Sequence, residues 1–281
     1  MVKVLLIGIT HIDKESQQKV TTYLNKFRPD AVCLELDQYR LDILIENESV
    51  QKESESNFIE LTEKNDGMDN EKQENDFPSE TNDSFFGFTS ILEDIGFFES
   101  RLASIIQTDQ PGNEMLIAYK VAKEIGAEIY LIDRSIHDIN SAMAEELSPE
   151  EAAKFQELID ELLFEKNIIS EPLGENHKNG YLENNSLHEI EEKEEINLNE
   201  VVEIFKDEES LTGILTIFKQ TFPKLYSILL EDRNDFMIRK IQEVIAKHNS
   251  IAIILGYGHV KEVAEGLKKI KEDIEIEIIT G

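Results

Sequence analysis

Residues 2–36 of the chain read VKVLLIGITHIDKESQQKVTTYLNKFRPDAVCLEL and contain the pattern from which the fold class follows. Val2–Ile9 is an apolar run that barely alternates with polar residues, which predicts a strand buried on both faces. Apolar residues then recur at helical spacing as far as Phe27, and Pro29 ends this helix. Ala31–Leu36 is a second apolar run. A strand, a helix and a strand in this order predict a parallel pair joined by a crossover helix.

The same order of strands and helices returns toward the end of the chain. Three further strands are predicted, each bordered by a segment with helical periodicity. The strands are Glu128–Ile132, Ile251–Leu255 and Ile274–Ile279, and the helices beside them are Glu114–Ile125 and Lys261–Ile270. Repeated strand–helix–strand units predict an α/β fold, with a mainly parallel, mixed central sheet that is flanked by helices.

Other segments with helical periodicity have no strand beside them. Phe85–Ile106 is apolar at roughly helical period, and Ser148-Pro149-Glu150-Glu151 is a capping box that opens a helix ending near Phe164. Phe222–Lys247 has the pattern of one long helix. Charged residues at Glu231–Asp235 interrupt its apolar stripe, so we expect the helix to bend or split there.

The net charge of −31 is concentrated in two stretches of the sequence. Residues 46–83 hold thirteen acidic residues and three lysines, and residues 171–200 hold nine and two, which together account for −17. Both stretches lack periodicity, so we expect disordered or lid-like insertions within a single domain over residues 1–281. The acidity excludes a general nucleic-acid binder. No apolar run reaches the ~18 residues of a membrane helix, and a cytoplasmic protein is expected.

Polar residues follow four of the predicted strands at the point where each strand ends. They are Gly8-Ile9-Thr10-His11, Glu35-Leu36-Asp37 with Arg40, Asp133-Arg134, and Gly256-Tyr257-Gly258-His259. In an open parallel sheet, ligands bind in the crevice outside the carboxyl ends of the strands. If these strands are parallel, two imidazoles, several carboxylates and two guanidinium groups meet at that crevice, which is typical of a functional site.

Each of these residues also has a purely structural interpretation. A single histidine at a strand end is more often a capped loop residue than a ligand. Glu35 and Asp37 lie at the end of the predicted second strand, and one would enter the crevice while the other caps the next helix or pairs with Arg40. Asp133 and Arg134 could form a structural ion pair, and the glycines could serve only to turn the backbone.

Arginine is rare in this chain, with six residues against twenty-two lysines. Arg40 and Arg134 lie beside the strand-end motifs, and Arg233 ends the sequence Glu231-Asp232-Arg233, which breaks the apolar face of the long helix. A planar guanidinium binds carboxylates and phosphates in a geometry that lysine cannot reproduce. The segment Glu231–Arg233 is therefore predicted to face a polar cavity.

Two neutral imidazoles and one carboxylate form a ligand set suited to Zn²⁺, Mn²⁺ or Co²⁺. Such a metal with an open coordination position lowers the pKa of a bound water and polarises a carbonyl group. A second carboxylate would then act as general base, while an arginine stabilises the developing oxyanion. The strand-end residues are thus compatible with metal-dependent hydrolysis.

Four stretches of the sequence resemble the TraB family. LIGITHIDKESQQKVTTYLNKFRPDAVCLELDQYR resembles the opening of these proteins, with Gly-x-x-His after one strand and Glu-Leu-Asp-x-x-Arg after the next. NEMLIAYKVAKEIGAEIYLIDR resembles their middle motif, LEDRNDFMIRKI their Glu-Arg-Asp-like helix, and IILGYGHVKEV their second Gly-x-x-His. The four stretches occur in family order, and the resemblance that they define extends over about three-quarters of the chain, without the acidic insertions.

The resemblance implies a fold shared with haem-binding ChaN-like proteins and erythromycin-esterase-like (EreA) hydrolases. It also implies a metal-dependent protease like the pheromone-shutdown and Tiki proteins, with Mn, Co or Zn held by His11, Glu35 and His259. The residues that the resemblance places in catalysis together with Glu35 are Arg40, Asp133, Arg134, Glu231 and Arg233. The residues that it places in the lining of the pocket are Gly8, Thr10, Asp37, Glu114, Asp232, Gly256, Tyr257 and Gly258. Many relatives continue into C-terminal membrane helices, so the question whether a longer product is tethered to a membrane stays open.

Three functions are compatible with these residues. The first is a metal-dependent hydrolase that cleaves a peptide or another small-molecule substrate. The second is a non-catalytic protein that captures a pheromone-like peptide or haem in the same crevice. The third is a scaffold whose acidic insertions recruit a basic partner. A homodimer is a candidate assembly for each of them.

Overall fold

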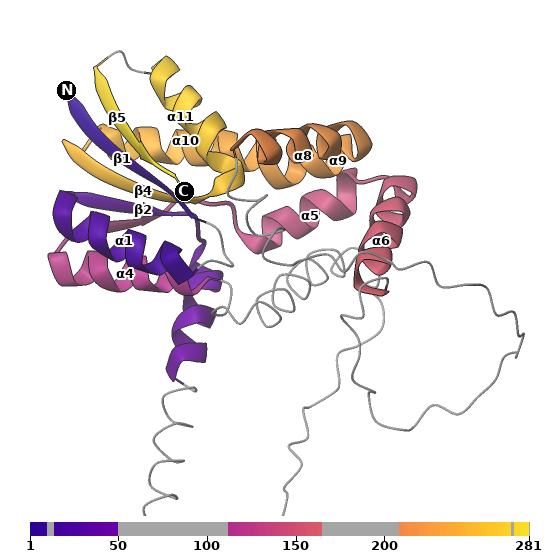
Figure 1. Ribbon diagram of the computed structural model, residues 1–281, viewed down its shortest axis with the longest axis horizontal. Helices are drawn as coiled ribbons and strands as arrows, with labels where there is room; N and C mark the ends of the chain where they lie inside the picture. The colour runs from indigo at the N-terminus through magenta and orange to yellow at the C-terminus, as the bar shows by residue number, and fades with distance from the viewer. Residues whose placement is uncertain (10–13, 50–111, 165–207, 271–272, 281) are drawn as a thin grey trace, which may run out of the picture.

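The computed structural model describes residues 1–9, 14–49, 112–164, 208–270 and 273–280 (Figure 1). Thr10, His11, the predicted helix Phe85–Ile106 and most of the two acidic stretches lie outside these ranges. Residues 46–49, at the start of the first acidic stretch, lie inside them and complete a helix over residues 38–49.

Five parallel strands form one sheet at the centre of the fold. They are β1 (Val2–Ile9), β2 (Ala31–Leu34), β3 (Glu128–Leu131), β4 (Ser250–Gly256) and β5 (Ile274–Ile279), in the order β3-β2-β4-β1-β5. Every strand pair is parallel, which confirms the predicted α/β class. No antiparallel strand that would make the sheet mixed is found among the described residues.

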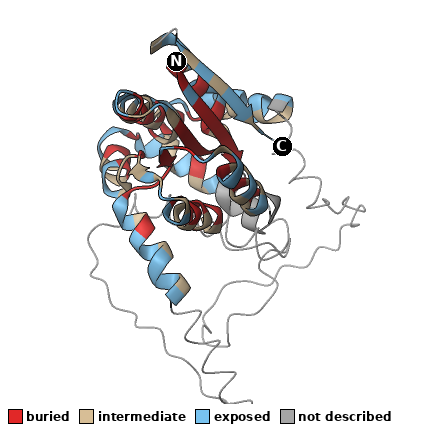
Figure 2. Ribbon diagram, turned by 90° about the vertical axis from the view of Figure 1, so that its left-hand side faces the viewer, coloured by how far each residue is buried: buried red, intermediate tan, exposed pale blue. Residues whose placement is uncertain are grey.

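Helices cover both faces of this sheet (Figure 1). α1 (Lys14–Phe27) and α4 (Asn113–Ile125) pack on one face, and α10 (Asp232–Ile245) and α11 (Tyr257–Ile270) pack on the other. The central strands β1 and β4 are buried on both sides, as their unbroken apolar runs predict (Figure 2). β5 at the edge of the sheet alternates between half-buried and exposed residues over most of its length.

A smaller apolar core lies beside the sheet, among the helices α5, α6, α8 and α9 (Figure 1). These helices are α5 (Ile136–Glu146), α6 (Pro149–Phe164), α8 (Glu208–Thr221) and α9 (Pro223–Tyr226). The rings of Phe155, Phe218 and Phe222 pack against one another with centroids 5.3 to 6.2 Å apart. Aromatic contacts of this kind hold the helical layer together without a sheet beneath it.

The predicted capping box at the start of α6 is half formed. The Ser148 hydroxyl accepts a hydrogen bond from the Glu151 backbone N–H at 3.1 Å, as the motif predicts. The Glu151 carboxylate instead accepts hydrogen bonds from the backbone N–H groups of Lys224 and Leu225, each at 2.9 Å. Glu151 therefore caps α9, a different helix, which a local motif could not reveal.

Two helix boundaries differ from the sequence prediction. The predicted long helix is α9, a π-helical turn over Ser227–Glu231, and then α10. The irregularity thus lies just before Asp232, and π-turns are frequent at functional positions. The helix expected from Lys261 begins at Tyr257, because β4 leads directly into α11. Neither Gly256 nor Gly258 has a positive φ angle, so these glycines do not turn the backbone.

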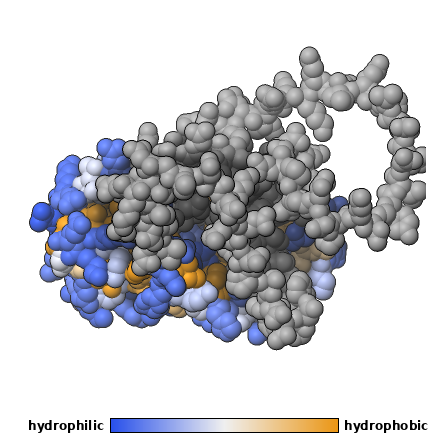
Figure 3. All heavy atoms as spheres, turned by 90° about the horizontal axis from the view of Figure 1, so that it is seen from below, coloured by the Kyte–Doolittle hydropathy of each residue, from blue (hydrophilic) through white to orange (hydrophobic). Residues whose placement is uncertain are grey.

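Where the described residues are visible from below, most of them are hydrophilic and the apolar ones lie in small groups (Figure 3). Tyr39, Ile43 and Ile45 on the helix 38–49 are among the exposed apolar residues of the described chain. Apolar side chains scattered in this way are ordinary on a protein surface and indicate no particular partner.

Gly266 on α11 packs against Ile238 of α10. A methyl group added there would overlap Ile238 Cδ1 and lie 3.1 Å from its Cγ1. Gly266→Ala is therefore expected to lower the free energy of unfolding by about 1 kcal/mol, because overpacking outweighs the ~0.5–1 kcal/mol gained from alanine in a helix. Urea-induced unfolding followed by circular dichroism measures the change.

Gly213 in the middle of α8 is the matched control for this variant. A methyl group added at Gly213 has no atom within 4 Å. Gly213→Ala is expected to raise the free energy of unfolding by about 0.5–1 kcal/mol, since the helix gains alanine at no steric cost. Equal stabilisation by both substitutions would show that α10 and α11 are not closely packed at Gly266.

Candidate functional site

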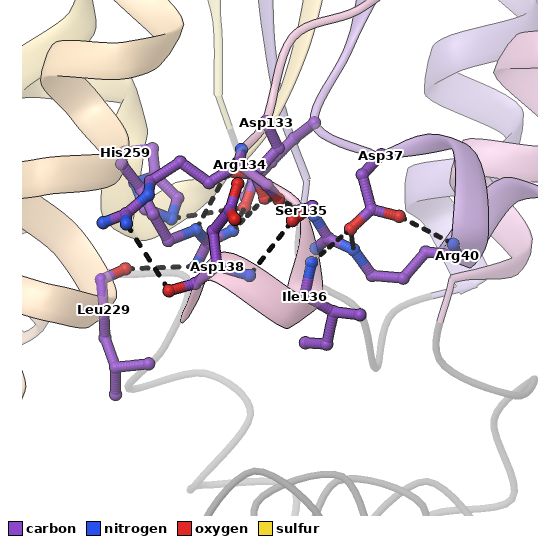
Figure 4. Close-up of polar contacts among 12 residues, drawn as sticks. Asp37, Arg40, Asp133, Arg134, Ser135, Ile136, Asp138, Leu229 and His259 are labelled. Atoms are coloured by element: carbon purple, nitrogen blue, oxygen red, sulfur yellow. Dashed lines mark hydrogen bonds and ion pairs between the residues drawn. The ribbon is translucent and has the colours of Figure 1, made fainter. Parts of the chain in front are cut away.

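Asp133 lies at the centre of a charged network beyond the carboxyl ends of β2 and β3 (Figure 4). Its Oδ2 accepts hydrogen bonds from Arg233 Nη2 at 2.7 Å and from Arg40 Nη2 at 2.8 Å. Its Oδ1 accepts from Arg233 Nε at 3.0 Å and from the Arg134 backbone N–H at 2.8 Å. The side chain is fully buried. Both oxygens of Asp133 are thus held by two donors each.

Arg233 joins Asp133 to Glu35. Its Nη2 donates to Glu35 Oε1 at 2.6 Å, while its Nη1 donates to the Leu229 carbonyl, within the π-helical turn, at 3.0 Å. The other carboxylate oxygen of Glu35 accepts from the Gly256 backbone N–H at 2.7 Å. Gly256 is the last residue of β4 and precedes α11, so a buried carboxylate faces the positive end of that helix.

His259 extends the network on the far side of Glu35. It lies in the first turn of α11, where it is 4% exposed. His259 Nε2 lies 3.2 Å from Glu35 Oε1, and His259 Nδ1 lies 2.6 Å from Asn234 Oδ1 on α10. The amide oxygen of Asn234 can only accept a hydrogen bond, so Nδ1 carries the proton. The Nε2 nitrogen then faces the carboxylate either with a second proton or with its lone pair.

The charges of the network fix its ionisation. Burial alone raises the pKa of the Asp133 carboxyl, but the charge and hydrogen bonds of Arg233, together with Arg40, hold that pKa below its ordinary value. Burial also disfavours the charged form of Arg233, and by itself it would lower the pKa of this guanidinium. The charges of Asp133 and Glu35 nevertheless raise that pKa above its ordinary value. Asp133 and Arg233 are therefore a charged pair at neutral pH, and neither is suited to transfer protons.

Asp37 has a capping role at this edge of the sheet. Its Oδ1 accepts from the Arg40 backbone N–H at 2.8 Å, which caps the helix 38–49. Its Oδ2 accepts from the Ile136 backbone N–H at 2.6 Å in the first turn of α5, and from Arg40 Nε at 3.1 Å (Figure 4). β2 ends at Leu34, so Glu35 and Asp37 both lie beyond the strand, which was predicted to reach Leu36. Both are buried at the same edge.

Arg134 is held more loosely than the other two arginines of the network. Its Nη1 lies 3.8 Å from Asp232 Oδ2, and its Nη2 lies 3.5 Å from the Asp138 carbonyl (Figure 4). The Arg134 side chain is 22% exposed. A guanidinium with long contacts can turn toward an incoming anionic group, whereas Arg40 and Arg233 are fixed by short carboxylate contacts.

Several of the predicted site residues are not part of the network. The structure does not bring Glu231 into the network, because its side chain is 46% exposed and paired with Lys219, and its catalytic role stays a prediction. Asp232 is 40% exposed and reaches the network through its 3.8 Å contact with Arg134. Gly8 packs β1 against Val260 of α11, because an added methyl group would lie 3.0 Å from Val260 Cγ2. A methyl group added at Gly258 would have one neighbouring atom, at an ordinary contact distance of 3.6 Å.

Two further predicted residues lie at the same edge of the sheet as the network. Glu114 is 3% exposed in the first turn of α4, and α4 runs antiparallel to the strand that follows it, so its start lies at the carboxyl edge. Tyr257 is half-buried at the start of α11 and lines a neighbouring groove. Thr10 and His11, which follow β1 at this edge, lie outside the described residues.

Asn234 is the site residue that the sequence analysis missed. It follows Arg233 directly and is 5% exposed. The signal that could have identified it is its place on the buried stripe of α10, where Met237, Ile241 and Val244 follow at helical spacing. A buried asparagine on an apolar stripe needs a hydrogen-bond partner, and here that partner is the His259 imidazole.

The chemistry of the donors fits a transition metal. Ligand atoms about 2.1 Å from Zn²⁺ at a tetrahedral angle lie roughly 3.4 Å apart, close to the spacing of His259 Nε2 and Glu35 Oε1. Metal-bound histidines usually donate their other ring N–H to a fixed acceptor, as His259 does to Asn234. Among the described residues, no group of three His, Cys, Asp or Glu side chains could hold a metal ion. A third ligand would have to come from outside the described residues, and His11 is the one that the family resemblance predicts.

Together, the fold and the network define an α/β protein with a charge-paired polar site at the carboxyl edge of a parallel sheet. The chain belongs to the TraB/PrgY/gumN family, whose profile matches residues 2–275, and the predicted family is thus confirmed. The chain is similar to a protein of Methanocaldococcus jannaschii named "Uncharacterized protein MJ1365", with 25% identity over 282 residues. The match covers 98% of this chain but 56% of that protein, so the chain spans about half the length of this relative.

None of the helices in the described ranges combines the length and the apolar character that crossing a membrane requires.

Proposed function

We propose that this chain is a metal-dependent hydrolase that cleaves peptides at the carboxyl edge of its sheet. One observation carries the proposal. The Asn234 amide oxygen fixes the proton of His259 on Nδ1 and directs Nε2 toward Glu35 Oε1 at 3.2 Å. An imidazole nitrogen that faces a buried carboxylate at this spacing is the arrangement expected of two ligands that share one cation.

Glu35, His259 and His11 would hold the metal, which when bound would supply an activated water and polarise the substrate carbonyl. The chain's own residues prepare this site. Arg233 and the Gly256 backbone N–H fix the two oxygens of the Glu35 carboxylate, so its orientation does not depend on the ligand. Glu35 is therefore the carboxylate suited to bind a cation or to hold a proton at Oε1.

Arg134 is the residue that we assign to the substrate oxygen. Arg40 and Arg233 are fixed on Asp133, but the contacts of Arg134 are 3.5 and 3.8 Å long. Moving its guanidinium toward a carbonyl oxygen that gains negative charge would cost little, and the buried site would strengthen the attraction. Asp133 positions Arg134 through the hydrogen bond from the Arg134 backbone N–H.

The proposal is tested by elemental analysis and by incubation of the protein with a mixture of synthetic peptides, followed by mass spectrometry. We expect near-stoichiometric Mn, Co or Zn in the wild-type protein and cleavage that depends on it. His259→Ala should lose both the metal and the cleavage. His248→Ala is the matched control, because His248 contacts Tyr130 and Glu128 and not the network.

Two outcomes would overturn the hydrolase. No metal in the wild-type protein after supply of Mn²⁺, Co²⁺ and Zn²⁺ would remove the chemistry proposed for Glu35 and His259. A bound peptide that is recovered intact after long incubation with metal would show a protein that captures its ligand without turnover.

A further inference from the structure

A groove with a volume of about 540 Å³ lies between α8 and α11. Its apolar lining comes from Leu211 and Leu215 on α8, from Val260 and Ala264 on α11, and from Ile278 on β5. Tyr257 and Gly258 line it at the start of α11, and Lys268 lines it near the end of that helix. The rise of about 1.5 Å per helical residue gives the groove a length of roughly 16 Å.

The groove adjoins the candidate site. Tyr257 and Gly258 immediately precede His259, whose side chain is buried on the other side of the same helical turn. Thr280, just beyond the carboxyl end of β5, also lines the groove. The groove therefore starts at the carboxyl edge of the sheet, where Glu35 and His259 meet, and runs along α11 away from the network.

The length and lining of the groove match an extended polypeptide. An extended chain advances about 3.3 Å per residue, so roughly 16 Å holds about five residues. Alternate side chains point the same way, so two or three of them would enter the apolar lining. The charged residues of the lining are Lys219, Lys261, Lys268, Glu262 and Glu265, which give a local charge of +1 in a chain of −31.

From this geometry we infer that the groove binds the part of a peptide substrate that lies beside the cleaved bond, and selects apolar side chains at alternate positions. The inference rests on the proposed function for the position of the cleaved bond. A second copy of the chain is a poorer occupant, because two chains that each carry a net charge of −31 repel one another.

Binding is measured separately from cleavage. The probe is a fluorescein-labelled decapeptide that alternates leucine and serine, compared with one in which alanine replaces leucine, and EDTA keeps the protein free of metal. Fluorescence anisotropy should show tighter binding of the leucine peptide. Leu215→Asp should weaken that binding at least about tenfold, because a charged group replaces an apolar contact in the groove.

Ile217→Asp is the matched control on the same helix. Ile217 is 64% exposed and does not line the groove, so this variant should bind the leucine peptide like the wild type. Circular dichroism establishes that both variants are folded. Equal weakening in both variants, or none in Leu215→Asp, would overturn the groove as the binding surface. A dimer in sedimentation that Leu215→Asp disrupts would assign the groove to a second copy instead.

Cleavage with metal then separates the two proposals. If the groove acts as inferred, sites cleaved by the wild type are flanked on one side by apolar residues, and Leu215→Asp loses this preference while still cleaving other sites. Peptide binding without any cleavage would overturn the hydrolase and leave the groove as a capture surface. Cleavage with the same preference in Leu215→Asp would overturn the groove and leave the hydrolase.

Discussion

Replacement of Asp133 by asparagine is expected to lower the free energy of unfolding by about 3–5 kcal/mol. The substitution keeps the shape of the side chain but turns one of its two oxygens into an amide NH₂. Oδ1 and Oδ2 each accept from two donors, so either orientation of the amide sets an NH₂ group against two N–H groups. It also leaves Arg40 and Arg233 with one buried carboxylate charge fewer between them.

Urea-induced unfolding at pH 7 measures the effect. The matched control is Asp235→Asn, at an exposed position on α10, where the expected change is within about 0.5 kcal/mol.

The pKa of Asp133 is lower in the folded protein than its ordinary value of 3.8. Its contribution is therefore complete above that pH and is lost as the pH falls through the lower, folded value. The difference between wild type and Asp133→Asn should thus shrink in acid. A difference that stays constant down to pH 2 would contradict the role of the charge.

The second large effect is expected for Glu35→Gln, and it is an effect on activity. Glutamine has the same shape, but it carries no charge and has one acceptor oxygen where Glu35 has two. Arg233 and the Gly256 N–H donate to different oxygens of Glu35, so one of these donors would face an NH₂ group. On the proposed function Glu35 is a metal ligand, so the metal content should fall, and kcat/KM for peptide cleavage should fall with it by at least about 10²-fold, more than the loss of an outer-shell partner causes.

Glu231→Gln is the matched control for Glu35→Gln. The sequence motif assigned both glutamates to catalysis, whereas the structure turns Glu231 toward Lys219 at the surface. Peptide cleavage and metal content should therefore be unchanged in Glu231→Gln. Equal losses in the two variants would mean that the network around Glu35 is not the reacting centre.

The strands were predicted well because a buried strand corresponds to one continuous run of apolar residues in the sequence. β1 and β5 have the predicted bounds, and β4 differs by one residue at each end. Burial on both faces requires an unbroken apolar run, and that requirement acts within a few residues of sequence. The parallel order then followed from the helices between the strands, which is why Glu35, Asp133 and His259 could be assigned to one edge.

The partners of these residues were not predictable in the same way. Glu151 has the sequence signature of a cap for its own helix, yet it caps α9. Glu231 and Arg233 are two residues apart, and the helix turns one to the surface and the other into the network. Asn234 carries no motif of its own and gains its role from α11, which brings His259 beside it.

By itself, the sequence determined the fold class, the family and the edge of the sheet at which charged residues gather, because each depends on local periodicity or on short ordered motifs. The tertiary structure alone decided which residues meet there. Asp133 and Arg233 are a hundred residues apart and Glu35 and Gly256 lie more than two hundred apart, so their contacts arise only when the sheet and its helices assemble. Hydrogen bonds between such distant groups depend on ångström-scale packing, which no local pattern of side chains encodes.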